Sequence, residues 1–287
     1  MINLVVASGK GGTGKTTVAV NLALTLAQDQ EDLELLDCDA EEPNCHLFIK
    51  PDFDNSWEVG IPVPAINSER CNYCGYCAEV CAFNALAVFT DQVMVLAELC
   101  HGCGSCAYFC PEKAISEYER TIGIIESGIA NGFRFVHGRL NAGEAMSPPL
   151  INAVKKQISF EKTTIIDAPP GTSCPVVSAV SDCDFCLLVT EPTPFGLNDL
   201  KLAHQMVNKL GVPAGVVINR SDIGDGKAEV YCRENNLPIL QKLPFDREMA
   251  ELYARSEPAV LHLPNWRRRF RDLYDRVVEA REEVDRL

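Results

Sequence analysis

Eight of the fourteen cysteines stand in two runs with the same spacing, C-x-x-C-x-x-C-x-x-x-C. The runs are Cys71, Cys74, Cys77 and Cys81, then Cys100, Cys103, Cys106 and Cys110. Thiolate sulfur in groups of four can hold either tetrahedral zinc or an iron–sulfur cluster. Three cysteines two residues apart wrap a cube of iron and sulfide better than a single ion, so the spacing favours two [4Fe-4S] clusters.

A second chemical signal is the stretch "GKGGTGKTT" near the N-terminus, which fits G-x-x-x-x-G-K-T. In such a loop, backbone N–H groups hold phosphates, the lysine reaches the β- and γ-phosphates, and the following hydroxyl binds Mg²⁺. Lys15 and Thr16 take these two roles here. The sequence therefore predicts an ATP/ADP and Mg²⁺ site made of Gly9, Gly11, Gly12, Thr13, Gly14, Lys15, Thr16 and Thr17.

Buried strands must position these residues. The apolar run "INLVVAS" leads into the glycine loop, and "VAVNLALTLAQ" has helical spacing after it. Three further apolar runs, "TTIID", "CLLVT" and "AGVVIN", also end in polar loops. Ligands gather at the carboxyl ends of parallel strands, so we expect an α/β fold with a mostly parallel sheet.

Composition excludes some classes of function. The 287 residues are 47% hydrophobic, which suits a sizeable core, and the net charge of −14 argues against nucleic acid as a partner. The N-terminus lacks a basic region with a cleavage site, and no apolar run reaches about eighteen residues. We therefore expect a cytoplasmic protein that does not associate with a membrane. For the cysteines, metal binding is preferred over disulfides.

The glycine loop also carries Lys10 after its first glycine, and this form resembles the deviant Walker A motif of MinD/ParA-type P-loop ATPases. That class includes the dinitrogenase reductase and the Mrp-type ATPases. The resemblance implies ATP hydrolysis by a dimer, either a homodimer or a heterodimer with a related ATPase. It further implies that Lys10 reaches the phosphates bound by the partner subunit, as an arginine finger does.

The same resemblance assigns further residues. Asp39 matches the aspartate that positions the attacking water, while Asp37 supports Mg²⁺ or the loop. Asp167 matches the aspartate near Mg²⁺. Asn219 is implied to read the adenine near "KLPFD", and Arg220 is included in the same cofactor-binding set.

The cysteine runs resemble a two-cluster bacterial ferredoxin, in which each run's fourth cysteine ligates the other cluster. The resemblance assigns one cluster to Cys71, Cys74, Cys77 and Cys110, and the other to Cys100, Cys103, Cys106 and Cys81. We expect an inserted ferredoxin-like α+β domain at residues 61–120 within a P-loop ATPase domain at residues 1–60 and 121–287. Short connectors are expected at both ends of the insertion, with Pro62 and Pro64 stiffening the entry, and a hairpin is expected from "TIGIIES" and "FRFVHGRL".

Three functions remain open at this point. Nucleotide-driven changes in a dimer could gate electron transfer through the clusters to an unidentified redox partner. Alternatively, the chain could load a cluster or metal onto a client protein, or act as a spatial or assembly switch with structural clusters. The complete set of eight ligands favours the first, because a cluster donor needs a labile site.

The remaining cysteines give weaker signals. Cys174, seven residues after Asp167, has the spacing of a cluster ligand in the dinitrogenase reductase, although a small buried residue at a helix start is the preferred interpretation. Cys183 and Cys186 form a C-x-x-C that could transfer a cluster, but core packing is favoured. The C-terminal helix from Trp266 carries an apolar face, expected to pack on the core or a partner rather than a membrane.

Overall fold

The computed structural model describes residues 1–29, 32–159 and 161–285. Within them the main sheet has nine strands in the order β11-β10-β9-β1-β8-β2-β7-β6-β3. The parallel strands are β1 (Asn3–Ala7), β2 (Leu33–Asp37), β7 (Phe133–Leu140), β8 (Thr163–Asp167), β9 (Phe185–Thr190), β10 (Ala214–Asn219) and β11 (Ile239–Leu243). The predicted α/β class with a mostly parallel sheet is confirmed.

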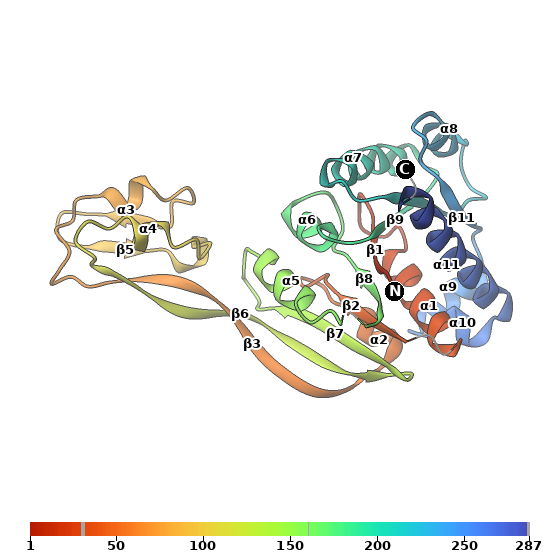
Figure 1. Ribbon diagram of the computed structural model, residues 1–287, viewed down its shortest axis with the longest axis horizontal. Coiled ribbons are helices and arrows are strands. Elements are labelled where there is room, and N and C mark those ends of the chain that lie inside the picture. Colours follow the sequence, from red (N-terminus) through yellow and green to blue (C-terminus); the bar gives the residue numbers. More distant parts are fainter. Residues whose placement is uncertain (30–31, 160, 286–287) are drawn as a thin grey trace.

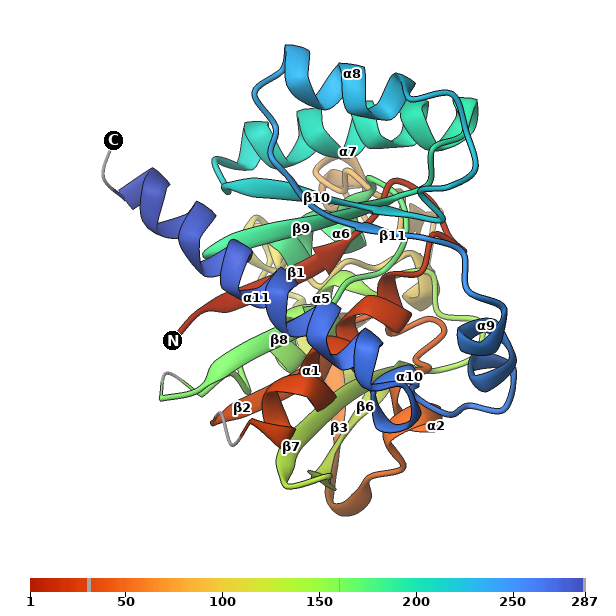
Figure 2. The ribbon, with the colours of Figure 1, turned by 90° about the vertical axis from the view of Figure 1, so that its right-hand side faces the viewer.

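Helices cover both faces of this sheet. In Figure 2, α1 (Lys15–Gln28) and α11 (Pro264–Asp285) cross in front of it, and α5 (Pro148–Lys155) and α6 (Cys174–Val180) lie behind. The other helices are α2 (Cys45–Ile49), α7 (Pro194–Leu210), α8 (Lys227–Glu234), α9 (Arg247–Ala254) and α10 (Ala259–His262). Alternate residues of β1 enter two separate cores, Leu4 and Val6 on the α1 side and Val5 on the α5 side. Burial on both faces explains why the strands read as continuous apolar runs.

Register brings the polar strand ends together. Asp37 ends β2 directly beside Asp167, which ends β8. The strand β1 lies next to β8 and leads into the glycine loop. The carboxyl edge of the sheet therefore collects the glycine loop and both aspartates, as expected for a parallel sheet.

Two long antiparallel strands close one side of the sheet, β3 (Asp52–Ile66) and β6 (Ile115–Ala130). The predicted short connectors were wrong, because their residues are the outer halves of these strands. Pro62 and Pro64 were expected to stiffen such a connector, yet they lie within β3, which is the edge strand, where a residue without an N–H group is tolerated. The predicted hairpin is confirmed, since β6 pairs with β7 from Gly123↔Leu140 to Ala130↔Phe133.

The β3–β6 pair, here called the arm, extends away from the sheet and carries residues 67–114 at its end (Figure 1). These residues, here called the cysteine module, contain β4 (Leu86–Val88) paired with β5 (Val93–Val95), a 3₁₀ turn at Ala97–Leu99, and the helices α3 (Tyr76–Glu79) and α4 (Ser105–Tyr108). Pairing in the arm extends from Asp52↔Ile129 to Ile66↔Ile115, with irregularities at Phe53/Asn55 and Val59/Gly60. The arm is thus the covalent and hydrogen-bonded connection between the module and the main sheet.

The C-terminal helix α11 packs as expected. Trp266, Phe270, Leu273 and Val277 are buried against α1 and the sheet, whereas Val284 near the end of the helix is 45% exposed. None of the helices in the described residues combines the length and apolarity that a membrane span requires.

Candidate functional site

The glycine loop has open space beside Gly11 and Gly12, where an added Cβ would meet nothing within 4 Å. Gly12 and Gly14 have φ of 78° and 98°, which favour glycine. A Cβ at Gly14 would lie 2.6 Å from Nδ2 of Asn219, and this Nδ2 donates to the carbonyl of Thr13 at 2.8 Å. Asn219 therefore braces the loop from β10, in addition to its predicted place beside the adenine.

Behind the loop, Lys15, Thr16 and Asp167 are all buried. The Thr16 hydroxyl donates to Oδ2 of Asp167 at 2.6 Å. Oδ1 of Asp167 and Oγ1 of Thr13 are buried with no hydrogen-bond partner within the described part of the chain. A buried polar atom without a partner is costly, so the site fits a bound cation at Asp167 and phosphate oxygens at the loop. When bound, Mg²⁺ would neutralise charge on the phosphates from the Thr16–Asp167 position.

Asp37 supports the loop that follows β2. Its carboxylate accepts backbone N–H groups of Asp39, Asn44 and Cys45, each at 3.0 Å. This agrees with loop support, one of the two roles predicted for Asp37. Cys45 was missed by the sequence interpretation, because no spacing marks it, yet its Sγ lies 3.4 Å from Oδ2 of Asp167.

The carboxyl groups here hold their protons unusually tightly. Burial raises the pKa of both Asp37 and Asp167. The negative charge of Asp167 raises the pKa of Asp37 further. Burial also raises the pKa of Asp39 to about 6, although Lys15 opposes the rise. A bound cation would favour the charged forms of all three.

We expect ATP hydrolysis to decline as the pH falls below about 6, because burial raises the pKa of Asp39 to about 6 in the empty site, bound Mg²⁺ would lower it, and the ionised carboxylate is the better acceptor for the attacking water. Above that pH the carboxylate form dominates and the rate levels off. The test is the rate of phosphate release between pH 5 and 8 for the parent and for Asp39→Asn. The variant should be slower by about 10² and should lack the acidic limb. An unchanged acidic limb in Asp39→Asn would assign it to another group.

A second open region extends from the glycine loop toward α9. It encloses about 880 Å³, part of it open to solvent, and its lining includes Asn219, Arg220, Pro244, Phe245 and Tyr253. The predicted adenine-side residues thus lie together. Arg220 also pairs with Glu191 at 2.9 Å. Met249 and Tyr253 of α9 line the same space, and no sequence pattern predicted either, because α9 is distant in the chain.

A separate space is lined by acids and prolines. Asp39, Glu41, Glu42, Pro169 and Ser173 border about 610 Å³, which includes open solvent. Cys174 begins α6 next to Ser173 and is exposed, so its expected burial was wrong. Lys10 is half-buried in the glycine loop, and its role across a dimer stays a prediction.

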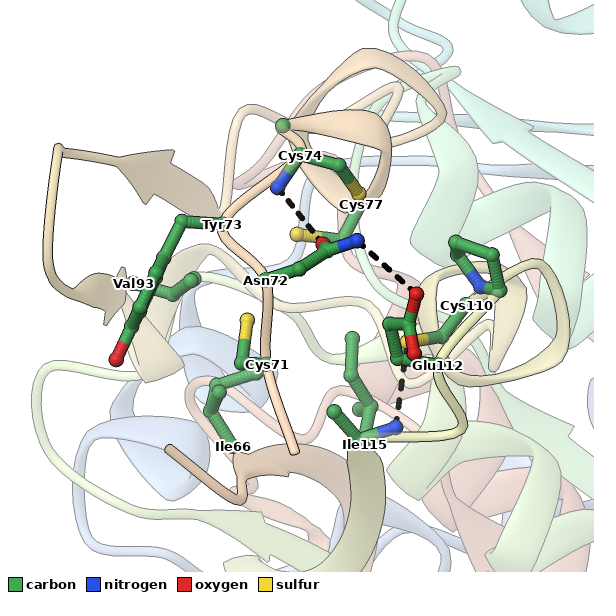
Figure 3. A pocket seen from close by; sticks show the side chains of 13 residues that line it. Ile66, Cys71, Asn72, Tyr73, Cys74, Cys77, Val93, Cys110, Glu112 and Ile115 are labelled. Atoms are coloured by element: carbon green, nitrogen blue, oxygen red, sulfur yellow. Dashed lines mark hydrogen bonds between the residues drawn. The ribbon is translucent and has the colours of Figure 1, made fainter. Parts of the chain in front are cut away.

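The cysteine module contains two pockets that each gather four cysteines. The first, here called cradle 1, is lined by Cys71, Cys74, Cys77 and Cys110 (Figure 3). Asn72 lies across its mouth, where its Oδ1 accepts the N–H of Cys74 at 3.1 Å and its Nδ2 donates to Glu112 at 3.0 Å. This bridge ties the first cysteine run to the end of the second.

The second pocket, here called cradle 2, gathers Cys81, Cys100, Cys103 and Cys106. The structure therefore groups each run's fourth cysteine with the other run. The two runs also turn alike, since Gly75 and Gly104 have φ of 84° and 73° and each precedes a short helix. These positive φ values explain a glycine after the second cysteine of each run.

The cradles fit a cluster better than a single ion. A tetrahedral zinc with Zn–S of about 2.3 Å brings its sulfurs to about 3.8 Å from one another. No three cradle sulfurs lie within 4.8 Å of one another in the part of the chain that is described. Backbone N–H groups of Ala85, Gly102 and Ala114 point at Cys81, Cys100 and Cys110 sulfurs at 3.3 to 3.4 Å, as donors to thiolates would.

The C-x-x-C pair is part of the core. Cys186 is fully buried on β9, and Cys183, 8% exposed, donates to the carbonyl of Ala179 at 3.4 Å. The preferred prediction of core packing is confirmed. The pair does not offer a surface site for cluster transfer.

Comparison with known proteins places the chain among nucleotide-binding proteins. The model of the CobQ/CobB/MinD/ParA nucleotide binding domain matches residues 4–259. An uncharacterised protein of Methanocaldococcus jannaschii is 34% identical, with 90% of this chain and 91% of the relative covered. An iron-sulfur cluster carrier protein of Pyrococcus horikoshii is 25% identical over 98% of this chain and 87% of its own length. The Pyrococcus furiosus cell division ATPase MinD superposes with a TM-score of 0.61 at 20% identity, covering 97% of this chain and 99% of that structure.

Proposed function

Because the chain belongs to the CobQ/CobB/MinD/ParA nucleotide-binding family and is a MinD-type P-loop ATPase, we propose that it couples ATP hydrolysis in a dimer to one-electron transfer. The electrons would pass through two [4Fe-4S] clusters. The observation that carries the proposal is that a complete phosphate site and two four-cysteine cradles occur in one chain, joined by the arm. The proposal includes the division into an ATPase domain and an inserted ferredoxin-like domain.

At the phosphate site the reaction is ATP and water to ADP and phosphate. Asp39 orients the water, whose oxygen bonds to the γ-phosphorus as the bond to the bridging oxygen breaks. Lys15 of the same subunit, and Lys10 from the second subunit, stabilise the negative charge on the phosphate oxygens. The acids around the open space beside Asp39 would attract that second cationic group.

At the other end of the arm, Cys71, Cys74, Cys77 and Cys110 would hold one cluster, and Cys81, Cys100, Cys103 and Cys106 the other. Bound clusters supply one-electron redox chemistry at low potential. The electron donor would be a reduced low-potential carrier protein, and the acceptor an oxidised redox partner. Each electron is taken from the donor and delivered to the acceptor without a bond being formed in this chain.

Cluster carriage is the second candidate, and the printed names of several relatives favour it. Iron-sulfur cluster carrier proteins from three genera match at 23 to 25% identity. In that case a cluster would be cargo, delivered to a client protein under control of ATP. The burial of Cys183 and Cys186 weakens this candidate, because no exposed C-x-x-C pair is left to hold the cargo in the described residues.

The experiment is the rate at which the dithionite-reduced protein, freed of excess reductant, reduces a low-potential viologen dye. With Mg-ATP the rate should exceed that with Mg-ADP by about tenfold, or 1.4 kcal/mol of activation free energy, and Lys10→Ala should remove the difference. Lys209→Ala, an exposed lysine on α7, is the matched control. Equal rates with both nucleotides would contradict the proposal, and transfer of iron to an apo-protein under the same conditions would favour carriage.

A further inference from the structure

Cradle 2 lies closer along the arm to the main sheet than cradle 1. Its lining includes Pro62, Pro64 and Glu117, whereas cradle 1 contacts Ile66 and Ile115, which pair at the far end of the arm. Cys100 is buried in the same apolar core as Ile61, Ile122 and Leu150. The core of the ATPase is therefore continuous with one cysteine of cradle 2.

Arg120 lies at this junction. It stands opposite Ile61 in the arm, and Sγ of Cys100 lies 3.9 Å from the carbonyl oxygen of the next residue, Pro62. A Cβ at Gly102 would lie 3.3 Å from Cβ of Ile61 and 3.0 Å from Cδ of Pro62, so this contact is close. Arg120 is thus a cation beside the first cysteine of the second run.

The Arg120 side chain is only 18% exposed, and both its terminal nitrogens bond to the carboxylate of Glu144. This bond raises the pKa of the guanidinium, and the charges of Glu98 and Cys100 add to the rise. Its Nε is buried and has no hydrogen-bond partner within the residues described. Arg120 does not itself line cradle 2, so its positive charge would act on a centre held there through space, across Ile61 and the loop after Cys100.

Glu144 belongs to the loop between β7 and α5, residues 141–147, which also contacts the segment that carries Asp39. The Ser147 hydroxyl donates to Glu41 at 3.0 Å, and the N–H of Leu140, just before the loop, donates to the carbonyl of Ala40 at 2.8 Å. On its other side, the N–H of Asn141 donates to the carbonyl of Ile122 in the arm at 2.9 Å. One short loop therefore joins the neighbours of Asp39 to the neighbours of Arg120.

We propose that Arg120 sets the reduction potential of the centre held in cradle 2, and that Glu144 makes this setting depend on the nucleotide bound near Asp39. Both clauses rest on the cluster that the proposed function assigns to cradle 2, and only the second also rests on the coupling to ATP. One-electron reduction by dithionite adds one negative charge to the centre and changes no bond at Arg120. A nearby cation favours the reduced, more negative form, and a shift of the 141–147 loop would move that cation.

The first test needs no nucleotide. In an EPR-monitored redox titration, Arg120→Gln should lower the reduced-to-oxidised ratio of the cradle 2 centre about tenfold at a fixed potential, equivalent to 59 mV for one electron. Cys74→Ser identifies the signal of cradle 1, which should not change in Arg120→Gln. Arg120→Lys, which keeps the charge, should retain most of the parent ratio.

The matched control is Arg139→Gln, which removes a cation from the neighbouring strand β7 without touching Glu144. Iron and sulfide contents equal to those of the parent show that each variant keeps its clusters. A parent-like ratio in Arg120→Gln, or equal shifts of both centres, would overturn the first clause. If Arg120→Gln loses iron, the same titration is made with Glu144→Gln, which removes the negative charge bound to Arg120 and should raise the reduced-to-oxidised ratio of the cradle 2 centre; a parent-like ratio would overturn the first clause.

The second test compares the parent and Glu144→Gln with and without Mg²⁺ and a non-hydrolysable ATP analogue. In the parent, the reduced-to-oxidised ratio of the cradle 2 centre at a fixed potential should change by at least about threefold when the analogue binds. Glu144→Gln should lose most of that change. A parent-like response in Glu144→Gln would overturn the relay and leave the proposed function standing. No response in the parent would contradict the proposed function, while Arg120→Gln still decides whether Arg120 sets the potential.

Discussion

Replacing Lys15 with glutamine is expected to lower the rate of ATP hydrolysis by about 10² to 10³, or about 2.7 to 4 kcal/mol of transition-state stabilisation. Lys15 is only 6% exposed and begins α1, directly after Gly14 of the glycine loop. Its ammonium acts on the carboxyls of Asp39 and Asp167, whose pKa values it lowers. Removing it takes away the cation that is predicted to reach the β- and γ-phosphates and leaves two buried acids less well compensated.

The measurement is the rate of phosphate release at saturating Mg-ATP, with nucleotide affinity measured by calorimetry. Lys209→Gln on the exposed side of α7 makes the same chemical change away from the site and should hydrolyse ATP at the parent rate. A Lys15→Gln rate within about threefold of the parent would remove this lysine from the catalytic machinery. A loss confined to nucleotide affinity would assign it to binding alone.

Replacing Cys106 with serine is expected to lower the iron content from about eight to about four atoms per chain, because one of two [4Fe-4S] clusters loses a ligand. Cys106 is buried in cradle 2, where burial raises the pKa of the free thiol to about 11. Only a bound metal would keep such a group as thiolate near neutral pH, so metal binding and folding of the module are linked. The melting temperature should fall together with the iron content.

Cys183→Ser is the matched control, because Cys183 and Cys106 are both 8% exposed. Its sulfur already donates to a backbone carbonyl, and a serine hydroxyl can make the same bond. Iron analysis of anaerobically purified protein should give the parent value for Cys183→Ser. Zinc in place of iron in the parent, or an unchanged iron content in Cys106→Ser, would contradict the cluster assignment.

Local patterns were enough to predict the phosphate site. The glycine loop, its strand and helix, and the acids that end β2 and β8 are each encoded within about fifteen residues. Parallel pairing then brings Asp37 beside Asp167 without further information. The β6–β7 hairpin was likewise predictable, because the pairing strands are adjacent in the chain.

Contacts between distant segments could not be predicted. Pro62 and Pro64 indicated a connector, and only the edge position of β3 allows them to continue a strand. Tyr253 lines the nucleotide pocket although α9 follows the glycine loop by more than two hundred residues. The Arg120–Glu144 pair and the contact of Cys45 with Asp167 join elements whose spacing in sequence carries no signal.

The most direct test of coupling between nucleotide and redox chemistry is an anaerobic, EPR-monitored redox titration of the parent protein with and without Mg-ATP. The account predicts signals from two clusters, with at least one midpoint displaced by tens of millivolts when nucleotide is bound, where 59 mV is about 1.4 kcal/mol for one electron. Two clusters with the same midpoints in both conditions would contradict it. ATP hydrolysis would then serve cluster carriage or assembly instead of electron transfer.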